Sequence, residues 1–160
     1  MTVKIRTSIQ RSERVPAQAD SVYALLKPVE SSSAFFPRVQ QIHALGDDRF
    51  LWKLEPMGTQ KFQHQVEYAS QWEFDDTGTT IRWRPLANQG NAKVSGVWAI
   101  EPASGQARIA LEIKAELLID LPRWMQMVAE PIVQTEFQKL LNRYFDNVIQ
   151  HCRTLETALS

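Results

Sequence analysis

Cysteine and surplus charge are what this sequence has least of. Cys152 is the single cysteine in 160 residues, which excludes an internal disulfide and a cysteine-rich metal site. Lysine plus arginine and aspartate plus glutamate number 18 each, so the formal net charge is zero. A protein that binds nucleic acid normally carries a basic surplus that neutralises phosphates, so we expect no nucleic-acid partner.

Long apolar runs are also missing. No stretch approaches the ~18 uninterrupted apolar residues of a membrane-spanning helix, so we expect no stable membrane insertion. Residues 1–15 alternate apolar with polar side chains, which predicts no signal peptide and a cytoplasmic location. No repeat, low-complexity segment or long Pro/Gly/Ser linker divides the chain, which favours a single domain over residues 1–160.

Apolar residues at every second position predict β-strands through most of the chain. Val3, Ile5 and Ile9 share one face of the first strand, and Pro16 ends it. Two short helices are expected next, the second over 29–36. Clean alternation between apolar and polar side chains indicates antiparallel pairing with one solvated face. The further strands are expected over 39–45, 49–56, 62–68, 81–84, 94–100 and 109–119, with turn residues between them.

After Pro122 the apolar period changes to three and four residues, which is typical of an amphipathic helix. We expect Pro131 in the first turn of its main part, after a shorter helix. The concave face of the sheet is the large apolar surface that can cover such a stripe. We therefore predict an α+β fold in which a curved antiparallel sheet of six or seven strands wraps around a long C-terminal helix. The stripe consists of Val128, Ile132, Thr135, Leu140, Leu141, Tyr144, Val148, Cys152 and Leu155.

Three stretches of the sequence resemble a known superfamily. Residues 15–26 (VPAQADSVYALL) are similar to its opening of a strand, Ala-Pro and a helix, with the proline here before the alanine. Residues 35–45 (FFPRVQQIHAL) are similar to its Phe-Pro-x-Val start of the second strand, and residues 94–102 (VSGVWAIEP) to its glycine-then-aromatic strand. Together with the order of elements, they resemble the helix-grip fold of the START-related superfamily, also called SRPBCC, over nearly the whole chain. The superfamily includes the birch-pollen-allergen-like proteins, and the polyketide cyclase/dehydrase-like subgroup, which also contains coenzyme-Q-binding proteins, is the most similar.

The resemblance implies a cavity between the sheet and the C-terminal helix that holds a small hydrophobic ligand, such as a lipid, an isoprenoid or quinone, a sterol or a polyketide. Large rings on the predicted inward faces support a cavity, although the same rings could fill it. The sequence has no Walker loop, GxGxxG or GxSxG motif and no histidine pair at metal-ligand spacing, so we expect no cofactor and no metal. The expected ligand-binding residues are Trp52, Phe62, His64, Tyr68, Trp83, Trp98, Trp124, Met127, Val128 and Ile132.

His64 is the candidate catalytic residue. It lies on a predicted inward face between Phe62 and Val66, where it could act as a general acid or base or donate a hydrogen bond to a ligand carbonyl. The alternative is a structural histidine that bonds a backbone carbonyl or lies at the cavity mouth. We favour a structural histidine, because a lone histidine rarely makes a catalytic site.

The Trp/Met-rich segment before Pro131 has two interpretations. Trp124, Met125 and Met127 could form a mobile apolar lid over the cavity mouth, because methionine suits adaptable ligand surfaces. They could equally be the ordinary packing of a helix start.

Three functions follow from these features, and the sequence sets no oligomeric state. The first is non-catalytic binding of a small hydrophobic ligand, which a tightly packed interior would contradict. The second is a polyketide cyclase or aromatase, in which the cavity orients the substrate and His64 or Tyr68 transfers a proton. The third is an interaction module with a filled core. We rank the interaction module last because the polar side of the helix, with Gln134 and Gln138, is typical of a solvated surface and not of an adhesive one.

Overall fold

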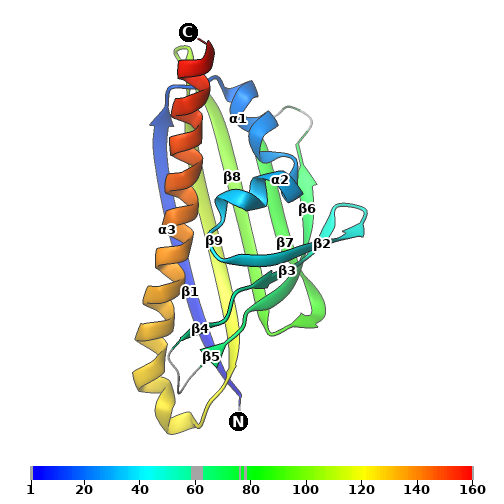
Figure 1. Cartoon of the computed structure of the whole chain (residues 1–160), viewed down its shortest axis with the longest axis vertical. Helices are drawn as coiled ribbons and strands as arrows, with labels where there is room; N and C mark the ends of the chain where they lie inside the picture. The colour runs from blue at the N-terminus through cyan, green and yellow to red at the C-terminus, as the bar shows by residue number, and fades with distance from the viewer. Residues whose placement is uncertain (1, 59–62, 76, 78, 160) are drawn as a thin grey trace.

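The computed structural model describes residues 2–58, 63–75, 77 and 79–159. A seven-stranded antiparallel sheet and a long C-terminal helix dominate it, and the short helices follow the first strand (Figure 1). The predicted α+β helix-grip fold is therefore confirmed. The elements are β1 (Thr2–Val15), α1 (Ala19–Leu26), α2 (Val29–Ser32), the 3-10 turn η1 (Ser33–Phe35), β2 (Val39–Gly46), β3 (Arg49–Leu54), β4 (Met57–Gly58), β5 (Gln63–His64), β6 (Glu67–Phe74), β7 (Thr80–Gly90), β8 (Ala92–Ala103), β9 (Gln106–Asp120), the 3-10 turn η2 (Arg123–Met125) and α3 (Gln126–Leu159).

The strand order of the large sheet is β1-β9-β8-β7-β6-β3-β2, so β1 and β2 form its edges. The register brings large rings together on neighbouring strands. Trp52 on β3 pairs with Tyr68 on β6, and Trp72 on β6 pairs with Trp83 on β7. Side chains of directly paired residues share a face of the sheet, so these four rings lie on one face.

Gly96 on β8 makes room for one of these rings. It pairs with Trp83, and a Cβ atom added at Gly96 would lie 2.2 Å from Cζ2 of the Trp83 indole. Real Cβ atoms do not approach other atoms so closely, so any side chain here would displace the indole. This contact is a physical reason for the glycine in the VSGVW stretch.

The core lies between the sheet and α3. Alternate residues of β9 are buried, as the alternation predicts, and Trp98 of β8 is fully buried. The Trp98 ring packs against two rings of α3, with centroid distances of 5.6 Å to Tyr144 and 5.7 Å to Phe145. The rings of Trp98 and Tyr144 thus connect the middle of the sheet to the second half of the helix.

The expected strand over 62–68 is interrupted. β5 ends at His64 and β6 begins at Glu67, and the side chain of Asn91 bonds the backbone between them. Its Oδ1 accepts a hydrogen bond from the Glu67 N–H, and its Nδ2 donates one to the Gln65 carbonyl. Phe62 lies outside the described residues.

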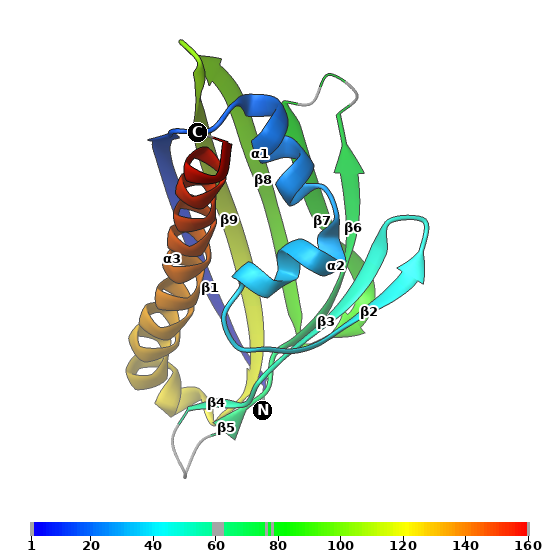
Figure 2. The ribbon, with the colours of Figure 1, turned by 45° about the horizontal axis from the view of Figure 1, so that its top comes forward.

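The helix prediction needs two corrections. Pro131 lies inside one continuous helix, α3, instead of starting a second one, and only the turn η2 precedes this helix. Of the predicted apolar stripe, the part from Leu140 to Cys152 is buried, whereas Val128, Ile132 and Thr135 are exposed. Figures 1 and 2 show the first turns of α3 at the end of the molecule that also holds β4 and β5. Sequence periodicity does not reveal where the sheet beneath a helix ends.

Glutamine side chains hold the first half of α3 to the edge strand β1. Gln134 Nε2 donates to the Arg6 carbonyl at 2.7 Å, and Gln138 Nε2 lies 3.4 Å from both the Ser8 carbonyl and the Thr7 hydroxyl. Gln138 is exposed, as expected of a solvated helix side, and Gln134 is partly buried; in addition, both side chains contact β1. Covering an edge strand in this way also blocks pairing with another chain.

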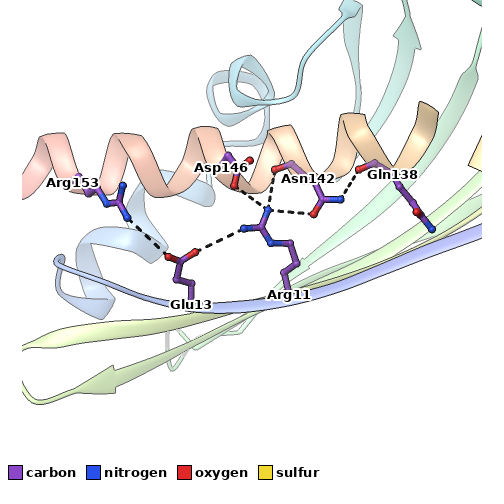
Figure 3. Close-up of polar contacts among 6 residues, drawn as sticks. All are labelled: Arg11, Glu13, Gln138, Asn142, Asp146 and Arg153. Carbon is purple, nitrogen blue, oxygen red and sulfur yellow. Dashed lines mark hydrogen bonds and ion pairs between the residues drawn. The ribbon is translucent and has the colours of Figure 1, made fainter. Parts of the chain in front are cut away.

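An arginine of β1 makes the corresponding contacts farther along α3 (Figure 3). Arg11 Nη1 donates to the backbone carbonyl and Oδ1 of Asn142, both at 3.2 Å, and to Asp146 Oδ1 at 2.9 Å. Its guanidinium also lies 4.4 Å from the centroid of the Phe145 ring. Several charge-assisted hydrogen bonds and a cation–π contact at one half-buried side chain make it a strong attachment point.

Candidate functional site

A small internal cavity lies between the sheet and α3. Its volume is about 20 Å³. A water molecule needs roughly 10–15 Å³, so the cavity holds one water and no lipid-sized molecule. Larger hollows of about 370–470 Å³ lie on the outer face of the sheet among charged side chains. The cavity is lined by Phe36, Trp52, Tyr68, Trp72, Trp83, Val94, Ile113, Phe137, Leu141 and Tyr144.

A series of nearly parallel rings forms the sheet side of this cavity. The Trp52 indole lies at 19° to that of Trp72, with ring centroids 6.3 Å apart. Trp72 in turn lies at 16° to Trp83, at 4.5 Å. Across from them, Phe36 packs at 5.3 Å against Tyr144 of α3. Aromatic pairs of this kind contribute about 0.5–1.5 kcal/mol each beyond their buried area, so the wall is well fixed.

The tryptophan N–H groups near the cavity differ in their hydrogen bonding. Trp72 Nε1 donates to Ser70 Oγ at 2.8 Å, and Trp98 Nε1 donates to the Tyr144 hydroxyl at 3.1 Å. Trp52 Nε1 is buried and has no hydrogen-bond partner among the described residues. A buried donor without a partner costs roughly 1–3 kcal/mol, so this N–H is the unusual polar group of the cavity wall.

The two tyrosines of the lining are neutral hydrogen-bonding groups. Burial raises the pKa of Tyr144 to about 12, and the hydrogen bond from Trp98 only partly opposes this rise. Burial, and secondarily the nearby Tyr144, raises the pKa of Tyr68 above its ordinary value. Neither phenol ionises near neutral pH, so neither side chain acts as a base from its ionised form.

His64 lies outside the lining of this cavity. It is half-buried on β5, where it pairs with Met57 of β4. Burial lowers the pKa of its imidazole, and its Nε2 is buried without a hydrogen-bond partner among the described residues. The neutral imidazole is therefore favoured at physiological pH, which is the form that accepts a proton.

The structure brings only some of the expected ligand-binding residues together. Trp52, Tyr68 and Trp83 line the cavity, whereas Trp98 lies in the core beside Tyr144. Four of the expected residues do not line the cavity and are exposed: Trp124 of η2 at 77%, and Met127, Val128 and Ile132 of α3 at 86%, 66% and 60%.

Sequence reasoning missed several lining residues. Trp72 shares its face with Tyr68 by strand alternation, so the period that selected Tyr68 could have selected Trp72 as well. Leu141 lies on the predicted apolar stripe but not among the expected ligand-binding residues, and Phe137, one helical turn before it, could have been added to the stripe by the same spacing. Phe36 comes from the turn after η1, where no periodicity applies.

A family model described as polyketide cyclase / dehydrase and lipid transport matches residues 6–145. The chain belongs to this family. The resemblance to the START-related superfamily is thereby confirmed, and the matched segment contains every residue that lines the cavity. No curated protein matches the chain.

Solved structures with a similar fold include members of this superfamily. A protein from Thermus thermophilus is 17% identical, with a TM-score of 0.69 over 94% of this chain and 98% of that one. A START superfamily protein from Mycobacterium smegmatis is 13% identical, with a TM-score of 0.68 over 92% and 98% of the two chains. The Zhui aromatase/cyclase from a Streptomyces species is 15% identical, with a TM-score of 0.63 over 92% and 93%. At such identities the likeness establishes the fold alone.

Family and fold together point to a ligand-binding domain of the START/polyketide cyclase-like type. None of the described helices is both long enough and apolar enough to cross a bilayer. Within the described ranges, no three His, Cys, Asp or Glu side chains gather where they could hold a metal ion. The chemical features available to a ligand at the cavity are therefore stacked rings, aliphatic groups and neutral hydrogen-bonding groups.

Proposed function

We propose that this protein binds a small hydrophobic ligand, such as a lipid, an isoprenoid or quinone, or a polyketide-like molecule, between the sheet and α3. The observation that carries the proposal is the aromatic cavity wall that includes Trp52, whose buried N–H has no partner among the described residues. The chain also belongs to a family whose description includes lipid transport. Apolar walls with a few polar groups that fix orientation are typical of small-molecule sites.

The cavity volume of about 20 Å³ limits how such a ligand enters. A tightly packed interior is the result that we expected to contradict ligand binding, and it does contradict a preformed ligand site. The proposal is therefore restricted to a site that opens to admit the ligand. The first three turns of α3 are the segment suited to move, since no side chain from Gln126 to Glu136 is fully buried. Pro131 weakens this segment further because it has no N–H to donate within the helix.

We place the entrance at this segment, with Trp124 and Met127 as parts of the lid. Both are exposed beside the first turns of α3, and Phe137 and Leu141 of the same helix line the cavity. Phe137 directly follows the exposed segment, so movement of the helix start would reach this lining residue first. A ligand delivered here would meet exposed apolar groups before it reaches the aromatic wall.

Titration of tryptophan fluorescence tests the proposal. Three of the five tryptophans line the cavity, so a bound ligand should change the emission. Palmitate, decylubiquinone and a flat aromatic polyketide such as emodin are the probes. We expect saturable 1:1 binding of at least one of them. Absence of saturable binding for all three, together with no hydrophobic molecule in solvent extracts of the purified protein, would contradict the proposal.

A cyclase or aromatase activity is the second candidate, and His64 is the observation that favours it. Its Nε2 is buried without a partner among the described residues, and burial lowers the pKa of the imidazole, so the neutral form that accepts a proton is favoured. Replacing His64 with Gln should then abolish turnover of a polyketide substrate while ligand binding persists. Equal turnover by the variant would exclude this residue as the base.

A filled-core interaction module is the third candidate, and the small cavity favours it. It requires a partner, which is either a second copy of the chain or another protein. Light scattering coupled to size-exclusion chromatography measures the first possibility. A clean monomer that still binds one of the three probes would count against this candidate.

A further inference from the structure

The N–H groups of three buried tryptophans, on β3, β6 and β8, differ in their hydrogen bonding. The N–H of Trp72 is bonded to Ser70, and the N–H of Trp98 is bonded to Tyr144. Trp52 is just as buried, at 5% exposure, yet its N–H has no partner among the described residues. Buried donors in folded proteins are nearly always satisfied, so an exception calls for a water or a ligand as the partner.

The position of Trp52 connects this unpaired donor with the cavity. Trp52 lines the cavity between two other lining rings, Tyr68 at 5.9 Å and Trp72 at 6.3 Å. An indole N–H donates and never accepts, so its partner must offer an acceptor atom. The Trp52 Nε1 atom is closed to water in this packed state, so the N–H gains a partner only when the cavity opens and a molecule with an acceptor atom enters.

We infer that, once the site opens, the Trp52 N–H donates to an acceptor oxygen at the edge of a flat conjugated ring that packs against the neighbouring Tyr68 and Trp72 rings. The nearly parallel planes of these rings favour a flat molecule, and the buried donor favours one that carries a carbonyl or ring oxygen. The inference rests on the proposed ligand binding and specifies the ligand class. Trp52 is here a specificity residue and takes no part in a reaction step.

Chromone and naphthalene form a probe pair that separates ring stacking from hydrogen bonding. Both are flat and bicyclic, and only chromone carries acceptor oxygens. The dissociation constant of each probe is measured by NMR titration of protein labelled with 15N at the indole nitrogens. We expect the Trp52 indole proton to move downfield with chromone and not with naphthalene, because a hydrogen bond to a carbonyl deshields it.

Two variants complete the test. Trp52→Phe keeps a ring but removes the unpaired donor, whereas Trp72→Phe removes a donor of the same cavity wall that is already bonded to Ser70. The preference for chromone over naphthalene should fall by about 10-fold in Trp52→Phe, since a buried hydrogen bond is worth about that factor, and stay unchanged in Trp72→Phe.

The outcomes distinguish this inference from the proposed function. If both probes bind and the Trp52 resonance does not respond to chromone, or the preference falls equally in both variants, the donor role is wrong while ligand binding stands. If neither probe binds, the binding site itself is contradicted. If Trp52→Phe does not fold, the response of the Trp52 resonance in the unmodified protein decides the question.

Discussion

The indole of Trp52 and the phenol ring of Tyr68 lie almost parallel, at 6°, with their centroids 5.9 Å apart. They are direct cross-strand partners of β3 and β6, so the strand register fixes their mutual position. The same register places Trp72 opposite Trp83. The aromatic wall is therefore part of the sheet itself, whereas the opposite wall, Phe137 and Leu141, belongs to the helix α3.

Gly96→Ala should damage this wall. The added Cβ would lie 2.2 Å from the Trp83 ring, and the buried indole has to shift to accept it. We expect a loss of about 1–3 kcal/mol in the free energy of unfolding, measured in urea, and a changed near-UV circular dichroism spectrum. Gly105→Ala is the control: its φ of 82° strains any side chain, but no atom lies within 4 Å of the added Cβ. It should lower stability and leave the aromatic spectrum unaltered; a stable Gly96→Ala with a native spectrum would contradict this packing.

Arg11→Ala should weaken the attachment of α3 to β1. The change removes hydrogen bonds to Asn142 and Asp146 and the contact with the Phe145 ring. We expect the free energy of unfolding to fall by about 1–3 kcal/mol. Arg84→Ala is the matched control, because its ion pair with Glu73 at 3.4 Å is largely exposed and should contribute less than about 1 kcal/mol. Equal losses in the two variants would refute a special role for Arg11.

Stability should depend on pH through His64. Burial lowers the pKa of its imidazole in the folded protein, so protonation is harder there than in the unfolded chain. The stabilisation is fully present above the unfolded pKa of about 6.5 and is lost as pH falls through the lower folded pKa. Thermal melting of wild type and His64→Gln across pH 7.5 to 5 isolates this contribution from other groups. The wild type should lose more stability than the variant over this interval; parallel curves would mean that His64 is not buried as described.

Hydrogen exchange should divide α3 into two halves. Amides of residues 126–136 lie in turns without a fully buried side chain, whereas those of 140–150 lie over the core. We expect the first group to exchange at least tenfold faster. Gln134→Ala should accelerate it further by removing the 2.7 Å bond to the Arg6 carbonyl, while Gln150→Ala, an exposed control, should not. Uniform exchange along the helix would argue against a lid.

Most of the fold was predictable because alternation along strands and the change of period after Pro122 are local properties of the sequence. The break between β5 and β6 was not, since the side chain that bonds both Gln65 and Glu67 there belongs to Asn91, a residue distant in the sequence. The exposed start of α3 was missed for a related reason. An apolar period shows which side of a helix could be buried, and the extent of the surface beneath it is a tertiary property.

The candidate site was predictable only in part. Trp52, Tyr68 and Trp83 were identified as inward rings and do line the cavity, while His64 does not. The volume of the cavity and the unpaired Trp52 N–H follow from how rings from several strands pack together. No pattern within a single strand contains that information.

The most direct test of ligand binding between the sheet and α3 is to fill the cavity. Leu141 lines the cavity from α3, and the larger side chain of Leu141→Phe would fill this small space. Ile149→Phe makes a similar addition at a buried position of the same helix that does not line the cavity. The dissociation constant of each of the three fluorescence probes is measured for both variants and the wild type. We expect any probe that the wild type binds to bind at least tenfold more weakly to Leu141→Phe and equally well to Ile149→Phe. Unaltered binding in a folded Leu141→Phe variant would contradict ligand binding in the cavity between the sheet and α3.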